Sequence, residues 1–167
     1  AISQADPDGY EIGMGVPPGT GIINYLAAPD QFEIDYADFT PIAILGQSTH
    51  VIAVNPDLDV DYQGLIDLYQ SGEISTFGGQ AVGSMVHIGA IQARDNHGME
   101  FDEYVAYDGT APTFQAVASG EIPAGISSET GAEPFAEDGD IEVVADLSHH
   151  GGLVMDIPSV EDFGYDN

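Results

Sequence analysis

The sequence contains no cysteine, no tryptophan and no lysine, and its single basic residue, Arg94, stands against 29 aspartates and glutamates. Without cysteine, neither a disulfide framework nor a thiolate metal site can form. Without cations, the chain has nothing to neutralise the phosphates of a nucleic acid or the headgroups of an anionic membrane. These absences exclude nucleic acid and anionic membrane surfaces as partners.

Long apolar runs are also missing. No stretch of eighteen apolar residues and no signal peptide occur, so we expect no direct insertion of this chain into a membrane. The chain begins at AISQADPDGY and ends at DFGYDN, and both ends look like cuts through a larger protein. We therefore expect any export signal to lie outside this sequence.

The acidic residues are spread between apolar segments rather than gathered in one block. The chain has 167 residues, 43% of them apolar, which is enough for a buried core in about one domain. Its net charge of −28 repels itself in dilute salt, but at molar salt the Debye length falls to about 3 Å. We therefore interpret the chain as a globular halophilic protein with a solvated acidic surface, not as an acidic tail.

Apolar runs and turn residues alternate along most of the chain. The pattern predicts strands near 51, 74, 104, 124 and 143 with a helix in each gap, which is typical of a parallel sheet with helices on its faces. Before them, we expect a strand at 10–16, a turn at Pro17-Pro18-Gly19, and a short helix capped by Thr20. The apolar runs 41–45 and 51–54 predict a long extended segment that crosses between two lobes.

The stretch ISTFGGQAVGSMVHIGAI, residues 74–91, predicts a strand, a break at Gly78-Gly79, and a helix that opens at Gly83-Ser84. Free N–H groups and the positive dipole end of such a helix can hold an anion without a basic side chain. The glycine spacing is close to that of a nucleotide-binding loop, but Ser84 replaces its lysine, which excludes a nucleotide hydrolase of that type.

Ligands of parallel α/β sheets bind beyond the carboxyl ends of the strands. Here those ends are 78–84, 107–111 and 127–130, which are rich in glycine or hydroxyl side chains and contain no cation. The sequence therefore predicts an anion site built from backbone amides.

Two alternatives remain open at this point. Ser84 and His87 lie three apart on one helical face, so an α/β enzyme acting on a small acid or ester is one alternative. Asp57, Asp59 and Asp61 suggest a calcium-dependent module, but an EF-hand loop needs a glycine and a glutamate where this sequence has Tyr62 and Leu68. We interpret these aspartates as an acidic helix N-terminus, and we expect no metal, no cofactor and no catalytic residue.

Five motifs follow one another in the order of a known family: DPDGYEIGMG, DFTPIAILGQSTHVIAVNPDL, FGGQAVGSMVHI, YVAYDGTAPTFQAVASGEIPAG and IPSVEDFG. Together they resemble the solute receptors of tripartite tricarboxylate transporters, the TctC or Bug proteins. The resemblance implies an α/β, periplasmic-binding-protein-like fold of type II, with a parallel or mixed sheet and helices on both faces. It also implies part of a first lobe at 1–46, a nearly complete second lobe at 47–147, and a return to the first lobe at 148–167.

By the same resemblance, the protein would be an extracytoplasmic receptor, not an enzyme, that captures a small carboxylate for membrane transporter subunits. The family's first strand and its ligand loop are missing before Ala1, so half the cleft would be absent, and Asp108 stands where relatives carry a basic residue. The residues implied to contact ligand are Gly79, Gln80, Ala81, Gly83 and Ser84, with His87 in the wall, Tyr107, Gly109, Thr110 and Ala111 in a second anion nest, Ser127 at the third strand end, and Pro18, Gly19 and Thr20 from the first lobe.

Overall fold

The computed structural model describes residues 5–6, 8–14, 40–148 and 151–166. The chain divides into two compact units, 1–46 and 47–167. The residues Pro18, Gly19 and Thr20, together with the helix predicted after them, lie outside the described residues.

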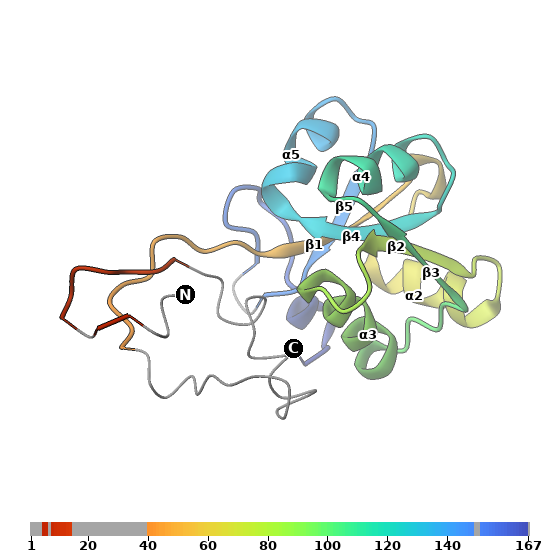
Figure 1. Cartoon of the computed structure of the whole chain (residues 1–167). Helices are drawn as coiled ribbons and strands as arrows, with labels where there is room; N and C mark the ends of the chain where they lie inside the picture. Colours follow the sequence, from red (N-terminus) through yellow and green to blue (C-terminus); the bar gives the residue numbers. More distant parts are fainter. Residues whose placement is uncertain (1–4, 7, 15–39, 149–150, 167) are drawn as a thin grey trace. The chain divides into compact units, whose positions relative to one another are not determined.

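The second unit alternates strands and helices, as the apolar pattern predicts (Figure 1). Its elements, in chain order, are β1 (His50–Val54), η5 (Pro56–Leu58), α2 (Tyr62–Ser71), β2 (Thr76–Gln80), α3 (Met85–His97), β3 (Glu103–Tyr107), α4 (Thr110–Ala118), β4 (Ala124–Ser128), α5 (Glu129–Glu137), β5 (Glu142–Asp146) and η6 (Val160–Phe163).

The five strands form one mixed sheet in the order β3-β2-β4-β1-β5. Strand β2 is parallel to β3 and β4, whereas β1 is antiparallel to both β4 and β5. The mixed sheet that the resemblance allowed is confirmed. The fully parallel sheet predicted from the alternation of strands and helices is wrong for β1. A buried apolar run shows that a strand is covered on both faces but does not show its direction.

Helices cover both faces of this sheet, α2 and α3 on one side and α4 and α5 on the other (Figure 1). Along β1, Ile52 and Val54 pack with the first pair of helices, while Val51 and Ala53 pack with the second. Alternate side chains of a strand point to opposite faces, so a continuous apolar run is what a strand between two helical layers requires.

Strand β2 continues through Gly78 and Gly79, so the predicted break at these glycines is wrong. A Cβ on Gly78 would meet the side chain of Ile122, and a Cβ on Gly79 would meet the hydroxyl of Tyr104. The two glycines therefore serve close packing on the two faces of a buried strand rather than a turn.

Two of the three aspartates interpreted as an acidic helix N-terminus, Asp57 and Asp61, lie at helix starts, but the interpretation is wrong for Asp59, which ends η5 with a left-handed φ of 49°. Asp61 caps α2 by accepting a hydrogen bond from the N–H of Gly64 at 2.8 Å. Asp57 lies in the first turn of η5, and Asn55 caps that element. Carboxylates in these positions satisfy free N–H groups and interact favourably with the helix dipole.

The described residues of the first unit contain no helix or strand. The predicted strand at 10–16 is therefore wrong for its described residues 10–14, and 15–16 lie outside the described residues; of the predicted extended segment, only β1 forms a strand. A strand needs a neighbour for its N–H and C=O groups, and no described segment pairs with residues 10–14 or 41–45. Among the described helices, none combines the length and apolarity needed to cross a membrane.

Candidate functional site

The three predicted ligand-binding turns lie at one edge of the sheet. Gln80 at the end of β2 pairs with Tyr107 at the end of β3, and the end of β4 follows beside β2. Because β1 runs in the opposite direction, its first residue, His50, pairs with Ser128 at the same edge. The start of β1 therefore joins the site, which the all-parallel prediction did not foresee.

The turn between β2 and α3 leaves several N–H groups open. Ser84 caps α3: its Oγ accepts from the N–H of His87 at 3.2 Å, and its own N–H donates to the carbonyl of Ala81 at 3.0 Å. Within the described part of the chain, the N–H groups of Ala81, Val82, Met85 and Val86 donate to no protein acceptor. Residues 81–83 are exposed, so an anion can reach this turn and the positive end of a thirteen-residue helix.

His87 braces this turn. The N–H of Gly83 donates to His87 Nδ1 at 3.1 Å, which assigns the ring proton to Nε2, and the imidazole packs on Tyr104 with ring centroids 4.6 Å apart. The hydroxyl of Tyr104 donates to the carbonyl of Gln80 at 2.8 Å, and burial raises the pKa of Tyr104 to about 12. The Gly83 amide, which was predicted to contact ligand, is thus engaged by the His87 ring.

Ser84 and His87 do not form a nucleophile–base pair. The recorded bonds of the Ser84 hydroxyl and of the His87 ring go to backbone N–H groups, not to one another. A serine nucleophile needs its base within hydrogen-bond reach. The enzymatic alternative finds no support in this geometry.

The turn between β3 and α4 depends on Gly109. Its φ of 106° and ψ of −176° are accessible to glycine alone, and it precedes α4 without a side-chain cap. In the described chain the first N–H groups of this helix, on Thr110 and Ala111, donate to no protein acceptor, and Pro112 has none to offer. These amides form the second open helix start.

The side chain of Tyr107 is directed away from this turn. Its hydroxyl donates to Glu121 at 2.9 Å in the connection from α4 to β4, which lies at the opposite edge of the sheet. Burial, reinforced by the bond to Glu121, raises the pKa of Tyr107 to about 12. Only the backbone of Tyr107 remains at the predicted site.

A partly buried network of side chains joins the three turns. Gln80 Nε2 donates to Ser127 Oγ at 2.9 Å and to Thr110 Oγ1 at 3.1 Å, and Ser127 Oγ donates to Thr110 Oγ1 at 2.8 Å. Ser128 Oγ lies 3.3 Å from the same Thr110 oxygen. Ser127 is fully buried, so it holds the turns together from inside.

The turn between β4 and α5 contains an acidic residue that sequence reasoning missed. Glu129 is buried, and its carboxylate accepts bonds from the N–H groups of Leu153, Val154 and Met155 at 2.8–2.9 Å. The N–H of Glu129 itself donates to the carbonyl of Thr49 at 3.1 Å. An acid at the first position of a helix is common, so the sequence carried no signal of this distant partner.

A second buried acid lies close by. Asp146 Oδ2 accepts from the hydroxyl of Thr49, and its Oδ1 accepts from the N–H of Ser148, both at 2.6 Å. Burial lowers the pKa of His50, which the charge of Asp146 partly opposes. Both buried acids of this edge are held by neutral donors, not by a cation.

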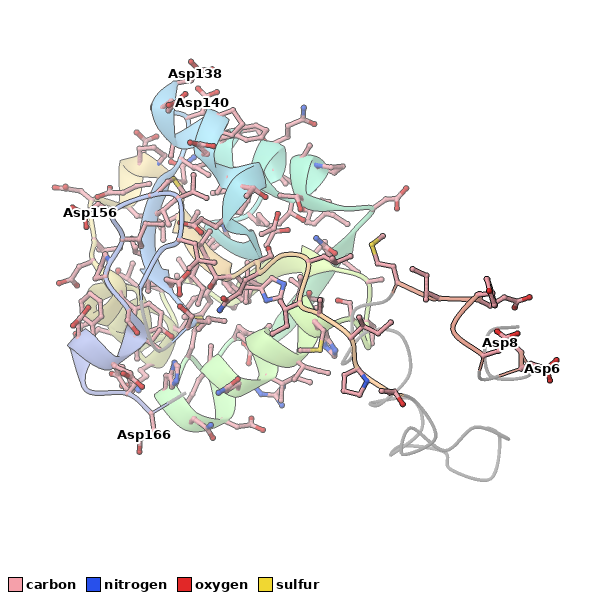
Figure 2. The ribbon with its side chains drawn as sticks, turned by 90° about the vertical axis from the view of Figure 1, so that its left-hand side faces the viewer. Asp6, Asp8, Asp138, Asp140, Asp156 and Asp166 are labelled. Carbon is pink, nitrogen blue, oxygen red and sulfur yellow. The ribbon has the colours of Figure 1, made fainter. Side chains whose placement is uncertain are left out.

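The remaining charged groups lie elsewhere. Arg94 is near the end of α3, 3.0 Å from Asp95 and over the ring of Phe101, which suits the structural role expected for it. The exposed Asp138, Asp140 and Asp156 project away from the ribbon (Figure 2). Across the described residues, no group of three or more His, Asp or Glu side chains is arranged to hold a metal.

A hollow of about 330 Å³ lies at the opposite edge of the sheet, lined by residues such as Leu58, Ile74 and Pro123. None of the residues predicted to bind ligand lines it. This hollow is therefore separate from the candidate site, whose residues 81–83 are exposed.

Comparison with known proteins agrees with the resemblance. The sequence profile of TctC, the tripartite tricarboxylate transporter family receptor, matches residues 1–167. No protein with a curated description matches the chain in sequence.

Three solved structures share the fold. A TctC solute-binding protein from Polaromonas, without ligand, has a TM-score of 0.74 at 22% identity over 83% of this chain and 49% of its own. An R. palustris protein with adipate has a TM-score of 0.67 at 24% identity, over 77% of this chain and 45% of its own. MatC from Rhodopseudomonas palustris, with bound malate, has a TM-score of 0.65 at 19% identity, over 76% of this chain and 44% of its own. The chain thus spans about half of each, and the predicted periplasmic-binding-protein-like α/β fold is confirmed.

Proposed function

The chain belongs to the tripartite tricarboxylate transporter receptor family, and from this membership we propose that it captures a small carboxylate outside the cytoplasm and presents it to membrane transporter subunits. The observation that carries the proposal is the joining of two open helix starts, α3 and α4, by the network of Gln80, Ser127 and Thr110. The two neighbouring helix starts offer N–H donors to a bound acid, so that no lysine or arginine is needed to hold it.

In this proposal, one ligand carboxylate binds the free amides of Ala81, Val82, Met85 and Val86, with His87 as the wall. The amides of Gly109, Thr110 and Ala111 take the second polar group of the ligand. Gly79, Gln80, Gly83, Ser84, Tyr107 and Ser127 shape these turns.

The net charge of −28 does not prevent such binding. A helix start contributes roughly 0.3–1 kcal/mol to a nearby anion, and each charge-assisted hydrogen bond adds about 1.5–3 kcal/mol at contact distance. Repulsion from distant surface carboxylates is screened beyond about 8 Å at physiological salt and about 3 Å at molar salt. Local amides therefore outweigh the global charge as salt rises, which agrees with a halophilic protein.

The bound acids of two structural relatives support a dicarboxylate as ligand. One relative was solved with adipate and the other with malate. Both acids carry two carboxylates and no cation, and the two open helix starts match that arrangement.

The test is isothermal titration of the protein with malate, adipate, citrate and an uncharged diamide control, in dilute and in molar salt. We expect binding of at least one acid, no binding of the diamide, and an affinity that persists or tightens as salt rises. Failure of all three acids, or a steady loss of affinity with salt, would contradict the proposal.

The enzymatic alternative makes a different prediction. An enzyme that uses Ser84 and His87 would turn over a small ester and lose that turnover in S84A. A receptor has no turnover to lose, so an ester assay of the parent protein separates the two.

A further inference from the structure

Glu129 is a buried carboxylate without a cation. Its exposed fraction is 1%, and three consecutive N–H groups, of Leu153, Val154 and Met155, bind its two oxygens at 2.8–2.9 Å. An isolated buried carboxylate is very unfavourable unless it is hydrogen-bonded, and this one is fully engaged. The N–H groups of residues 153–155 therefore form an anion nest, and the carboxylate of Glu129 is the anion that binds in it.

The shape of that segment is fitted to the carboxylate. A Cβ on Gly152 would meet the carbonyl of Met155 and approach Glu129 Oε1 to 2.6 Å. Glycine is thus needed where the backbone closes around the acid. The N–H of Gly152 donates to the carbonyl of Ile157, which fixes the same segment from its other side.

Glu129 also holds the start of β1 through its backbone. Its N–H donates to the carbonyl of Thr49, and the Thr49 hydroxyl donates to the buried Asp146. Asp146 in turn accepts from the N–H of Ser148. One residue of α5 is therefore connected to the segment that leads into β1, to the end of β5, and to residues 153–155.

Ser128, the residue before Glu129, lies at the candidate site. Ser128 Oγ lies 3.3 Å from Thr110 Oγ1, the oxygen that also receives Gln80 and Ser127. A shift at the start of α5 would move Ser128 and disturb that network. The position of Glu129 is thus linked to the geometry of the candidate site.

We propose that Glu129 is a positioning residue: by filling the amide nest of residues 153–155, its carboxylate fixes the start of α5 and keeps the Ser128–Thr110 contact in the geometry that carboxylate binding needs. The part of this inference that concerns ligand affinity rests on the proposed function. A residue that only stabilises the fold would lower stability and leave the affinity of folded molecules unchanged.

The test compares E129Q with N55A. Glutamine keeps the size of Glu129 but has one acceptor oxygen, so it cannot accept from all three N–H groups. Asn55 caps η5 and binds the carbonyls of Val117 and Ala118 at the opposite edge, so N55A loses stability without touching the site. Titration with malate, adipate and citrate is done where circular dichroism shows both variants fully folded.

We expect E129Q to weaken the binding of whichever acid the parent binds by about tenfold or more, and N55A to leave it within about twofold. Unchanged affinity in E129Q, or equal loss in N55A, overturns the proposal. If E129Q does not fold, E129D takes its place, with a smaller loss expected because the shorter side chain keeps its charge.

Amide hydrogen exchange separates this inference from the proposed function. If the parent binds none of malate, adipate and citrate, the proposed function fails, and the role of Glu129 is then tested by amide exchange alone. We then expect E129Q to speed exchange at 153–155 by about tenfold or more and to raise it around Ser128 and Thr110, while N55A changes neither. Equal exchange in parent and E129Q overturns the positioning role.

Discussion

The β2–α3 and β4–α5 turns are made of the same parts: a strand end, a serine and a helix start. They differ in their hydrogen bonds, because in the described chain the first offers unpaired N–H donors and the second offers a carboxylate acceptor. At the first, the amides of Ala81, Val82, Met85 and Val86 are open. At the second, the helix contributes a carboxylate of its own, Glu129, which three N–H groups of a neighbouring segment bind. In a chain with one basic residue, the buried Glu129 is thus held by backbone amides rather than by a cation.

The difference also separates a permanent contact from a reversible one. Glu129 is buried, so an unpaired carboxylate there would be strongly unfavourable and all three N–H groups are needed to balance its desolvation. Residues 81–83 are exposed, so an anion there keeps part of its hydration and can leave. The proposed site follows from this exposure, and the variants below test each side of the comparison.

The largest effect is expected for G152A, which breaks the filled nest. The new Cβ would meet the backbone carbonyl of Met155 and the Glu129 carboxylate, so the segment must move and the buried acid loses donors. We expect a loss of about 3 kcal/mol in the free energy of unfolding, measured by urea denaturation. The control is G139A, whose Cβ meets nothing and whose cost comes from its φ of 75° alone; it should lose only about 1 kcal/mol. Equal losses would show that the nest has no special fit.

The next effect concerns the open turn, where S84D separates helix capping from ligand binding. Aspartate caps a helix as well as serine, so we expect the free energy of unfolding to stay within about 0.5 kcal/mol of the parent. Its carboxylate would compete for the open amides and repel the ligand, so malate affinity should fall by about tenfold or more. S84A should show the reverse, a stability loss of about 1 kcal/mol with little change in affinity. An S84D variant that binds malate normally would remove the β2–α3 turn from the site.

A smaller effect is expected for S127A, which removes the buried hydroxyl between the turns. Gln80 Nε2 loses an acceptor and Thr110 Oγ1 loses a donor, so we expect the free energy of unfolding to fall by about 1–2 kcal/mol and malate affinity to fall with it. The exposed S71A, whose hydroxyl binds the carbonyl of Leu68, should change stability by less than about 0.5 kcal/mol. If S127A matched S71A in urea denaturation, the network would not hold the turns together.

The sequence predicted the elements of this comparison but not the contacts between them. The alternation of apolar runs and turns predicts the strands, the helices and the positions of the turns, because local patterning reports burial. It does not report direction or distant partners, so the reversal of β1 and the bonds of Glu129 to residues 153–155 were out of reach. Gly78 and Gly79 misled for a related reason: glycine serves turns and close packing alike, and only the neighbours Tyr104 and Ile122 decide between them.

The smallest effect lies at the other end of α3 and serves as a control for both turns. His97 Nε2 donates to the carbonyl of Asp166 at 3.1 Å, and in the neutral ring Nδ1 accepts from the Tyr62 hydroxyl at 2.6 Å. Burial lowers the pKa of His97, so the unfolded chain takes up the proton more readily, and stability is lost as the pH falls through about 6.5. Urea denaturation at about pH 7.5 and 5.5 should show a loss of about 1 kcal/mol or less at the lower pH, reduced in H97Q. His50, whose pKa burial also lowers, should leave a residual pH dependence of stability in that variant.

Because His97 is far along α3 from Ser84, amide exchange at 81–86 and at 153–155 should not follow this titration. A change there would mean that the two ends of α3 are coupled and that the two turns cannot be compared independently.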